Sequence, residues 1–207
     1  MGDWRDGGSV GVGVAAADAD ANKAQSARCF FARSIRHVLY PSSVSLGVHF
    51  ALTAAQLKRI RAARGDDDAV LELLEEIEDA WDAEWLVQSD KAWDAMHRAL
   101  ADGQLTFEGG KQHAPLGLVV LGGESMVEDD DETVVLLEPS SVAAAAQAMT
   151  KLTEECFRER YFRLCPGYAP EFGDEDFDYT WSHLRSVRDF FAKAAKAKRS
   201  IVFTASS

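Results

Sequence analysis

Apolar and polar residues follow a regular period only after about residue 44. From Leu46 to Leu52 every second residue is apolar, which is the period of a strand with one buried face. The hydroxyl of Thr53 can then accept a hydrogen bond from the first turn of a helix over residues 54–63. Residues 1–43 are rich in Gly, Ala and Asp and show no such period. We therefore expect residues 1–43 to be a disordered leader or a mis-assigned start, and residues 44–207 to form a single domain.

The next two apolar patterns have helical spacing. The first begins after Asp66–Asp68, whose side chains can cap it. Its apolar stripe is Val70, Leu74, Ile77 and Trp81, and its opposite side carries Glu72, Glu75, Glu76 and Asp79. The second is a helix that begins at Asp90 after a Ser89 cap. Its inner side carries Trp93, Met96, His97 and Leu100. We expect both stripes to face the core.

The second half of the domain predicts a small sheet and further helices. Residues 116–121 are a continuous apolar run and residues 133–137 read as a strand, and together they favour a β-hairpin. The remaining expected elements are helices over 139–148, over 153–162 and from about Tyr179, a loop over 164–177, and a last strand at Ile201–Phe203. Strands at both ends and in the middle, with helices clustered between them, indicate an α+β fold with a small mixed or antiparallel sheet packed with several helices.

Negative charge limits the partners that the domain can have. The chain has a net charge of −12 at pH 7. Residues 1–43 hold five basic and four acidic groups, so residues 44–207 hold 17 basic and 30 acidic groups and a charge of −13. Such a surface repels phosphates and anionic lipid headgroups. We expect neither nucleic acid nor membrane among the partners, and a basic protein is the partner that the charge favours.

Cysteine usage and hydropathy indicate the cytoplasm. The three cysteines form neither a C-x-x-C pair nor an even set, which is typical of free thiols in a reducing compartment. No apolar run approaches the roughly 20 residues that span a bilayer. We therefore expect a cytoplasmic protein, and the sequence leaves its oligomeric state open.

The third expected helix carries the first group of candidate site residues. Trp93 and His97 are one turn apart and project to the same side, with Asp90 and Lys91 at the helix start. His97 can act there as a general acid or base, with Asp90 or Glu124 orienting it and Lys91 stabilising an anion. His49, on the first strand, can face the same cleft. The favoured interpretation is structural, with Asp90 capping the helix and His97 bonding a buried carbonyl.

A glycine pair after the apolar run supplies the second group. Gly122 and Gly123 let the backbone approach a neighbour closely, and Glu124 can then face a cleft beside His97 or His49. The spacing matches neither a P-loop nor a dinucleotide-binding fingerprint. A β-turn with an exposed acid is the favoured interpretation.

Other chemistry has little support in the sequence. No two of the five histidines have zinc-like spacing with a cysteine or carboxylate, and no G-x-S-x-G motif occurs. The acidic run Glu128–Glu132 and the acidic cluster within Glu171–Asp178 lack the ligand spacing of a calcium loop. No metal and no cofactor is therefore predicted. We expect both acidic segments to be solvated loops, with a docking surface for a basic partner as the functional alternative.

Two functions follow from these patterns. The favoured one is a non-enzymatic binding or interaction domain, of an immunity or regulatory type, that engages a basic protein through the acidic loops. The alternative is a small enzyme with a pocket around His97, Asp90 and Glu124 that acts on a small molecule. A shared, solvent-open pocket would favour the enzyme, and a His97 sealed under Trp93 would disfavour it.

Residues 46–203 resemble the YfbM-like family, a bacterial domain of unknown function. Four landmarks carry the resemblance: Leu46-Gly47-Val48-His49-Phe50 with Leu52-Thr53, Asp90-Lys91-Ala92-Trp93 with His97 one turn on, Gly122-Gly123-Glu124 after an apolar run, and the closing Ile201-Val202-Phe203. The second landmark is the most specific. The family's usual closing aromatic residue and leucine are here Thr204 and Ala205. The resemblance implies an α+β fold and a bacterial cytoplasmic setting, and it implies no established activity.

Deleting residues 1–43 should leave the melting temperature of the domain unchanged, because this segment has no periodic apolar face to bury. A GUG start codon reads as valine inside a gene, so we interpret Val44 as the initiator. Thermal unfolding of the truncated and full-length chains compares their melting temperatures. A loss of several degrees on truncation, or native peptides from upstream of Val44 in mass spectrometry, would contradict this interpretation.

Overall fold

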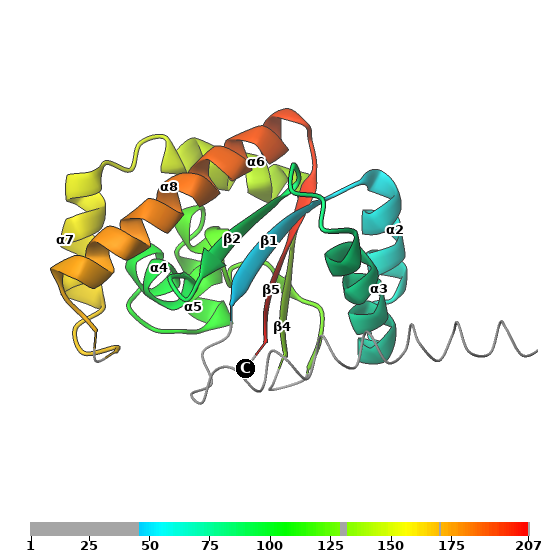
Figure 1. Ribbon diagram of the computed structural model, residues 1–207, viewed down its shortest axis with the longest axis horizontal. Helices are drawn as coiled ribbons and strands as arrows, with labels where there is room; N and C mark the ends of the chain where they lie inside the picture. The colour runs from blue at the N-terminus through cyan, green and yellow to red at the C-terminus, as the bar shows by residue number, and fades with distance from the viewer. Residues whose placement is uncertain (1–45, 129–131, 170, 207) are drawn as a thin grey trace, which may run out of the picture. The chain divides into compact units, whose positions relative to one another are not determined.

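A five-stranded antiparallel sheet organises the part of the chain that the computed structural model describes, residues 46–128, 132–169 and 171–206. Its strands are β1 (Gly47–Leu52), β2 (Leu86–Asp90), β3 (Glu124–Ser125), β4 (Glu132–Leu137) and β5 (Ser200–Ser206). They lie in the order β2-β1-β5-β4-β3, and each neighbouring pair is antiparallel (Figure 1). The expected α+β class is confirmed, and the sheet is antiparallel. The expected leader, residues 1–43, lies outside the described residues.

The last strand of the chain lies in the middle of the sheet. β5 pairs with β1 on one side, where Thr204 is opposite Val48. It pairs with β4 on the other side, where Thr204 is opposite Val134. Every residue from Ile201 to Ala205 is buried. β5 therefore joins the β1–β2 pair to the β3–β4 hairpin.

Two helices cover one face of the sheet. They are α2 (Ala54–Ala62) and α3 (Asp67–Ala80), drawn on the right of Figure 1. Thr53 and Gln56 form a capping box at the start of α2, and the Asp66 carboxylate accepts a hydrogen bond from the Ala69 amide at the start of α3 (3.1 Å). Helices and sheet bury one continuous core between them, made of Phe50, Leu52, Ile60, Val70, Leu74, Ile77, Met126, Val127, Val134, Leu136 and Val202.

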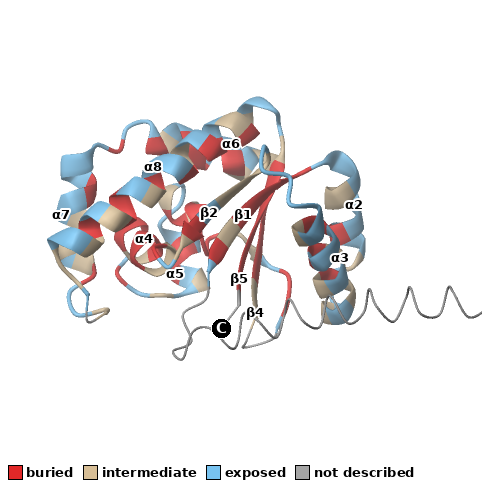
Figure 2. Cartoon of the chain, in the orientation of Figure 1, coloured by how far each residue is buried: buried red, intermediate tan, exposed pale blue. Residues whose placement is uncertain are grey.

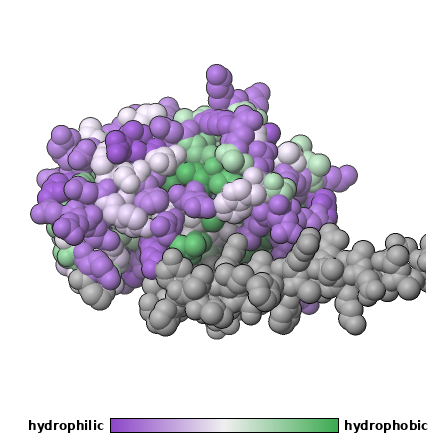
Figure 3. Space-filling model, viewed as in Figure 1, coloured by the Kyte–Doolittle hydropathy of each residue, from purple (hydrophilic) through white to green (hydrophobic). Residues whose placement is uncertain are grey.

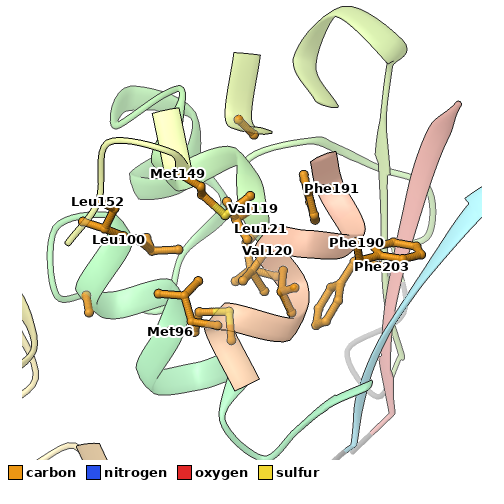
Figure 4. Close-up of a cluster of buried hydrophobic side chains, with 14 of the residues drawn as sticks. Met96, Leu100, Val119, Val120, Leu121, Met149, Leu152, Phe190, Phe191 and Phe203 are labelled. Carbon is orange, nitrogen blue, oxygen red and sulfur yellow. The ribbon is translucent and has the colours of Figure 1, made fainter. Parts of the chain in front are cut away.

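The opposite face of the sheet carries the larger core. The helices on this side include α4 (Trp93–Leu100), α6 (Pro139–Met149), α7 (Glu154–Leu164) and α8 (Asp174–Lys196). Buried residues line their inner sides in Figure 2, and Figure 4 shows their apolar side chains gathered around Val119 and Phe191. Because side chains alternate along a strand, β5 sends Phe203 into this core and Val202 into the other. No helix among the described residues is long and apolar enough to cross a membrane.

Residues 116–121 do not form the predicted strand. Leu116–Val119 is a short 3₁₀ helix, η1, and the hairpin partner of β4 is β3, in which Glu124 is opposite Leu136. The prediction was wrong because a continuous apolar run looks the same in a strand and in any other fully buried segment. A further helix, α5 (Phe107–Gln112), was not among the predicted elements.

Close backbone contacts hold this segment in place. A Cβ atom on Gly117 would lie 2.3 Å from the carbonyl oxygen of Gly110, and one on Gly122 would lie 2.6 Å from the carbonyl oxygen of Gly117. α5, η1 and the turn at Gly122 therefore touch backbone to backbone, an approach that only glycine permits.

Two helix starts differ from the sequence predictions. Asp90 ends strand β2 instead of beginning a helix, and α4 begins at Trp93. Ser89 is buried, and its hydroxyl donates a hydrogen bond to the Gly47 carbonyl (3.1 Å) instead of capping a helix. α8 begins at Asp174 and not near Tyr179, so part of the second acidic cluster forms its first turn.

Trp81 ends α3 and lies at the exposed edge of the core in which we expected it to be buried. Its backbone is left-handed, with φ 38°, and 43% of the residue is exposed. The reversal at Trp81 ends the helical period, so the stripe through Val70, Leu74 and Ile77 does not continue to it. The indole ring still meets the ring of Phe50 edge-on, with centroids 6.4 Å apart.

Gly117→Ala should lower the free energy of unfolding by about 1–3 kcal/mol, because the new methyl group would overlap the Gly110 carbonyl. Urea unfolding measures the difference. Gly173→Ala is the matched control, since the nearest atom to its Cβ would be 3.9 Å away and its φ of 162° is extended. Equal stability of the two variants would contradict the close backbone packing.

Candidate functional site

Three of the four landmark segments meet at one end of the sheet. A Cβ atom on Gly47 of β1 would lie 2.6 Å from the Ser89 hydroxyl oxygen and 2.8 Å from the Trp93 ring. The same atom would lie 2.9 Å from the ring of Phe203 in β5, whose centroid is 5.8 Å from that of Trp93. Gly47 is therefore required for packing, and Trp93, which is half-buried, closes this end of the core.

Asp90 and Lys91 form a corner that Tyr179 of α8 holds. Asp90 has a left-handed backbone, φ 47°, where the chain turns between β2 and α4. The Lys91 amide donates to the Tyr179 hydroxyl (3.3 Å), and that hydroxyl bonds the Asp90 carboxylate. Burial, followed by the bond with Asp90, raises the pKa of Tyr179 to about 12. The phenol therefore stays protonated near neutral pH and donates to Asp90.

His183 extends this corner along the edge strand. Its ring meets the Tyr179 ring edge-on, with centroids 4.7 Å apart, and its Nδ1 donates to the Gln88 carbonyl (3.3 Å). Tyr179 and His183 lie one turn apart on α8 and fasten that helix to β2. Sequence reasoning missed both residues, although their i, i+4 spacing beside an apolar stripe is a signal that they share one side of the helix.

His49 is sealed in the core. It is fully buried, and its ring lies 5.7 Å from that of Phe191 and 4.7 Å from that of Phe203, between centroids. Its Nε2 donates to the Val119 carbonyl (2.9 Å), which ties η1 to β1. Burial lowers the pKa of His49 to about 4, although the hydrogen bond to Val119 opposes this shift. The imidazole is therefore neutral at pH 7, and its Nδ1 has no hydrogen-bond partner among the described residues.

His97 is also sealed, on α4. Its exposed fraction is 0%, and its Nε2 donates to the Thr106 carbonyl (3.0 Å). The Thr106 hydroxyl in turn accepts a hydrogen bond from the Gly109 amide at the start of α5 (3.0 Å). Burial is the main reason that the pKa of His97 lies below its ordinary value. The expected bond to a backbone carbonyl is present, although Thr106 is exposed and the carbonyl is not the buried one that we expected. The bond fastens α5 to α4.

Gly122, Gly123 and Glu124 make contacts that stabilise the fold. A Cβ atom on Gly123 would lie 2.5 Å from the Leu136 carbonyl oxygen, so this glycine, like Gly122, packs against backbone. Glu124 forms an ion pair with Arg64, which follows α2. It therefore holds the β3–β4 hairpin next to α2.

The candidate residues do not line one pocket. In the described part of the chain, the two best-formed depressions lie elsewhere. One is lined by Gln56, Arg59, Ile60, Leu73, Glu76 and Ile77, and the other by Met149, Leu152, Trp181, Leu184, Arg185 and Arg188. Within the described residues, no group of three or more His, Cys, Asp or Glu side chains is placed to hold a metal ion. The arrangement gives general acid–base chemistry no common site.

The outward side of α3 is a continuous acidic surface. The helix contains no lysine or arginine, and its carboxylates are those of Asp67, Asp68, Glu72, Glu75, Glu76, Glu78 and Asp79. Like charges one turn apart, such as Glu72 and Glu76, destabilise a helix by about 0.2–0.5 kcal/mol per pair. Arg59 of α2 offsets part of this cost through two hydrogen bonds to Glu76 (2.6 and 2.9 Å).

Two carboxylates of the acidic cluster at the start of α8 make internal contacts. Asp174 pairs with Arg158, and Asp176 accepts hydrogen bonds from the hydroxyls of Tyr161 (2.5 Å) and Tyr168. These contacts anchor the start of α8 to α7 and to the loop before it. α3 differs from α8 in that it carries no lysine or arginine along its length, whereas Lys193 and Lys196 lie in the last turn of α8.

The first acidic run adjoins the same surface. The Glu128 amide donates to the Asp67 carboxylate at the start of α3 (3.0 Å). Residues 129–131 of the run lie outside the described residues. The described end of this run thus extends the acidic surface of α3 beyond the helix.

His49 should make the domain less stable as the pH falls below about 6.5. Its pKa is about 4 in the folded chain against an ordinary 6.5, so in this window the unfolded chain binds a proton that the folded chain does not. Between pH 7 and pH 5 the free energy of unfolding should fall by about 2 kcal/mol because of His49. His49→Gln keeps a donor for the Val119 carbonyl and does not titrate. Urea unfolding at both pH values should show a smaller loss in this variant, and equal losses would contradict a buried neutral His49.

Comparison with known proteins gives the chain a family. No curated protein matches it. Among solved structures, YfbM from Escherichia coli, a protein of unknown function, matches with a TM-score of 0.55 and 18% sequence identity. The match covers 77% of this chain and 99% of that chain, and it shows a shared fold. The model of the family described as Domain of unknown function (DUF1877) matches residues 45–204. The resemblance to the YfbM-like family is confirmed, and the chain belongs to the DUF1877 family.

Proposed function

We propose that the chain is a cytoplasmic, non-enzymatic interaction domain that binds a basic protein partner through the acidic surface of α3. The observation that carries this proposal is the concentration of carboxylates on a helix that has no lysine or arginine. Neighbouring like charges weaken the helix, and Glu78 and Asp79 lie at the negative end of its dipole. A charge pattern that costs stability is expected where it serves recognition of a partner.

The same geometry gives little support to a small enzyme. A general base must come within about 3 Å of the proton that it removes. His49 and His97 have no exposed surface, and their Nε2 atoms bond backbone carbonyls. Glu124 pairs with Arg64, on a different part of the sheet from the corner at Asp90.

Charge also determines the class of partner. Residues 44–207 carry 17 basic and 30 acidic groups, which favours a basic protein over nucleic acid or an anionic membrane. Attraction between exposed charges speeds association and is screened by salt over about 10 Å at 0.1 M ionic strength. An immunity or regulatory role, in which an acidic domain masks a basic surface, fits this mode of binding.

Immobilised full-length protein should retain a basic protein from a bacterial lysate at low ionic strength and release it as salt is added. Glu72→Gln combined with Asp79→Asn should retain markedly less of it, because both substitutions remove exposed charge from α3. They also remove like-charge neighbours one turn apart, so the melting temperature should not fall.

The matched control is Glu159→Gln combined with Asp178→Asn. These residues are also exposed and lie on α7 and α8, on the other side of the sheet from α3 (Figure 1). The control should retain the partner as the wild type does. Equal loss in both variants, or no basic protein retained by the wild type at low salt, would contradict the proposed function.

A further inference from the structure

An apolar strip lies beside the acidic surface. Side-chain alternation puts Val48 and Phe50 of β1 on the face that carries α2 and α3, and the ladder places Leu86 of β2 opposite Phe50. Trp81 follows α3, and its ring edge meets the Phe50 ring. We call Val48, Trp81 and Leu86 the edge strip.

The edge strip is only partly covered. Phe50 beneath it is 3% exposed, whereas Trp81 is 43% exposed. Val48 and Leu86 are half-buried. Figure 3 shows hydrophobic surface at the centre of the view, where β2 faces the viewer in Figure 1. Apolar surface gathered in this way marks sites where another molecule binds.

β2 also presents backbone groups along its outer edge. The Ala51 amide donates to the Trp85 carbonyl (2.8 Å), so in the alternating antiparallel pattern Val87 also faces β1. The amides and carbonyls of Leu86 and Gln88 then point away from β1. His183 reaches the Gln88 carbonyl with a long bond of 3.3 Å. An edge strand with outward backbone groups can pair with an extended segment of another chain.

Carboxylates border the edge strip on the side of α3. Glu78 accepts a hydrogen bond from the Thr204 hydroxyl (3.4 Å), and Thr204 is opposite Val48 in the sheet. Asp79 and Asp82 are exposed on either side of Trp81 in the sequence. The apolar surface and its acidic border complement a segment that carries both apolar side chains and lysine or arginine.

We propose that the edge strip is the docking site for an extended, basic segment of a partner protein, which joins the sheet as a strand beside β2. This rests on the proposed function, because it specifies how the acidic side of the domain holds its partner. The backbone of the segment bonds Leu86 and Gln88 and replaces His183 at the Gln88 carbonyl. An apolar side chain packs against Trp81, and basic side chains face the carboxylates at the end of α3.

Charge argues against a second copy of this chain as the occupant. Two copies joined at β2 would bring the same acidic borders together, and residues 44–207 hold 30 acidic groups against 17 basic ones. Like charges placed across an interface oppose association. A basic segment gains attraction at the same positions.

Three short labelled peptides can test the docking site on the full chain. One alternates lysine and leucine, one alternates lysine and serine, and one alternates glutamate and leucine. Fluorescence anisotropy measures affinity, and amide hydrogen exchange followed by NMR reports the binding mode. The lysine–leucine peptide should bind at least about tenfold more tightly than the other two. It should also slow exchange of the Leu86 and Gln88 amides, which a helix docked on side chains would leave unprotected.

Trp81→Asn should weaken binding of the lysine–leucine peptide by about tenfold or more, since exposed tryptophans are frequent anchors of interfaces. Asparagine tolerates the left-handed backbone of this position, so the fold should persist, and the melting temperature checks this. The control, Glu159→Gln with Asp178→Asn, should bind the peptide like the wild type.

Unchanged binding to Trp81→Asn, or unchanged exchange at Leu86 and Gln88, would overturn the docking site. The full chain could instead form a dimer that Trp81→Asn abolishes and that the peptide does not dissociate. This result would assign the edge strip to a second copy of the chain and would also overturn the docking site. If both lysine peptides bind equally and Glu72→Gln with Asp79→Asn weakens both, the docking site fails and the proposed function stands. If neither lysine peptide binds and no basic protein is retained, both fail.

Discussion

The insertion of β5 between β1 and β4 is the constraint on which the rest of the structure depends. It is the last element of the chain, yet it joins the β1–β2 pair to the β3–β4 hairpin. An isolated pair of strands is marginally stable in water, so neither half of the sheet is expected to persist alone. β5 also separates the two cores, because Val202 packs under α2 and α3 while Phe203 packs under α4 and α8. The pairing of Val48 with Thr204 closes a long stretch of chain, whose entropy cost the two cores must offset.

The residues by which the family is recognised mostly fasten elements to this sheet. Gly47 lets Trp93 and Phe203 come together, and His49 ties η1 to β1. Gly122 permits the turn after η1 to touch its backbone. Arg160 of α7 works in the same way, because it donates to the carbonyls of Ala99 and Ala101 at the end of α4 (2.6 and 3.2 Å). The landmarks therefore describe how the fold is held together, and they indicate no shared chemistry.

Elements with local signals were predictable from the sequence. The strand after Leu46 has a two-residue apolar period, and the helix after Thr53 begins with a capping side chain. The structure confirms both, and it also confirms the helix predicted over 153–162, which Thr153 caps. β2 was missed because Leu86–Asp90 is an edge strand of mixed polarity, and its state is set by pairing with β1. Residues 116–121 were assigned wrongly because contacts between distant glycines, which no local pattern encodes, decide their path.

The candidate site residues also divide into those whose contacts the local sequence predicts and those whose contacts it does not. That His97 is buried and bonds a backbone carbonyl could be expected from its place on an apolar helix face, and it does so, although the acceptor residue Thr106 is exposed. The corner at Asp90 could not be expected, because Tyr179 and His183 reach it from a helix far along the chain. Trp81 was placed in the core because the helical period continues to it in sequence, whereas its left-handed backbone ends α3 and exposes the indole.

α3, Trp81 and the outer edge of β2 are the parts of the molecule to which we assign partner binding. Hydrogen–deuterium exchange of the full chain, alone and with the lysine–leucine peptide bound, tests whether these parts form the binding surface. We expect slower amide exchange in α3 and at Leu86 and Gln88 of β2, with exchange in α7 unchanged. Slower exchange confined to α7 or to the corner at Asp90, with α3 and β2 unchanged, would contradict it.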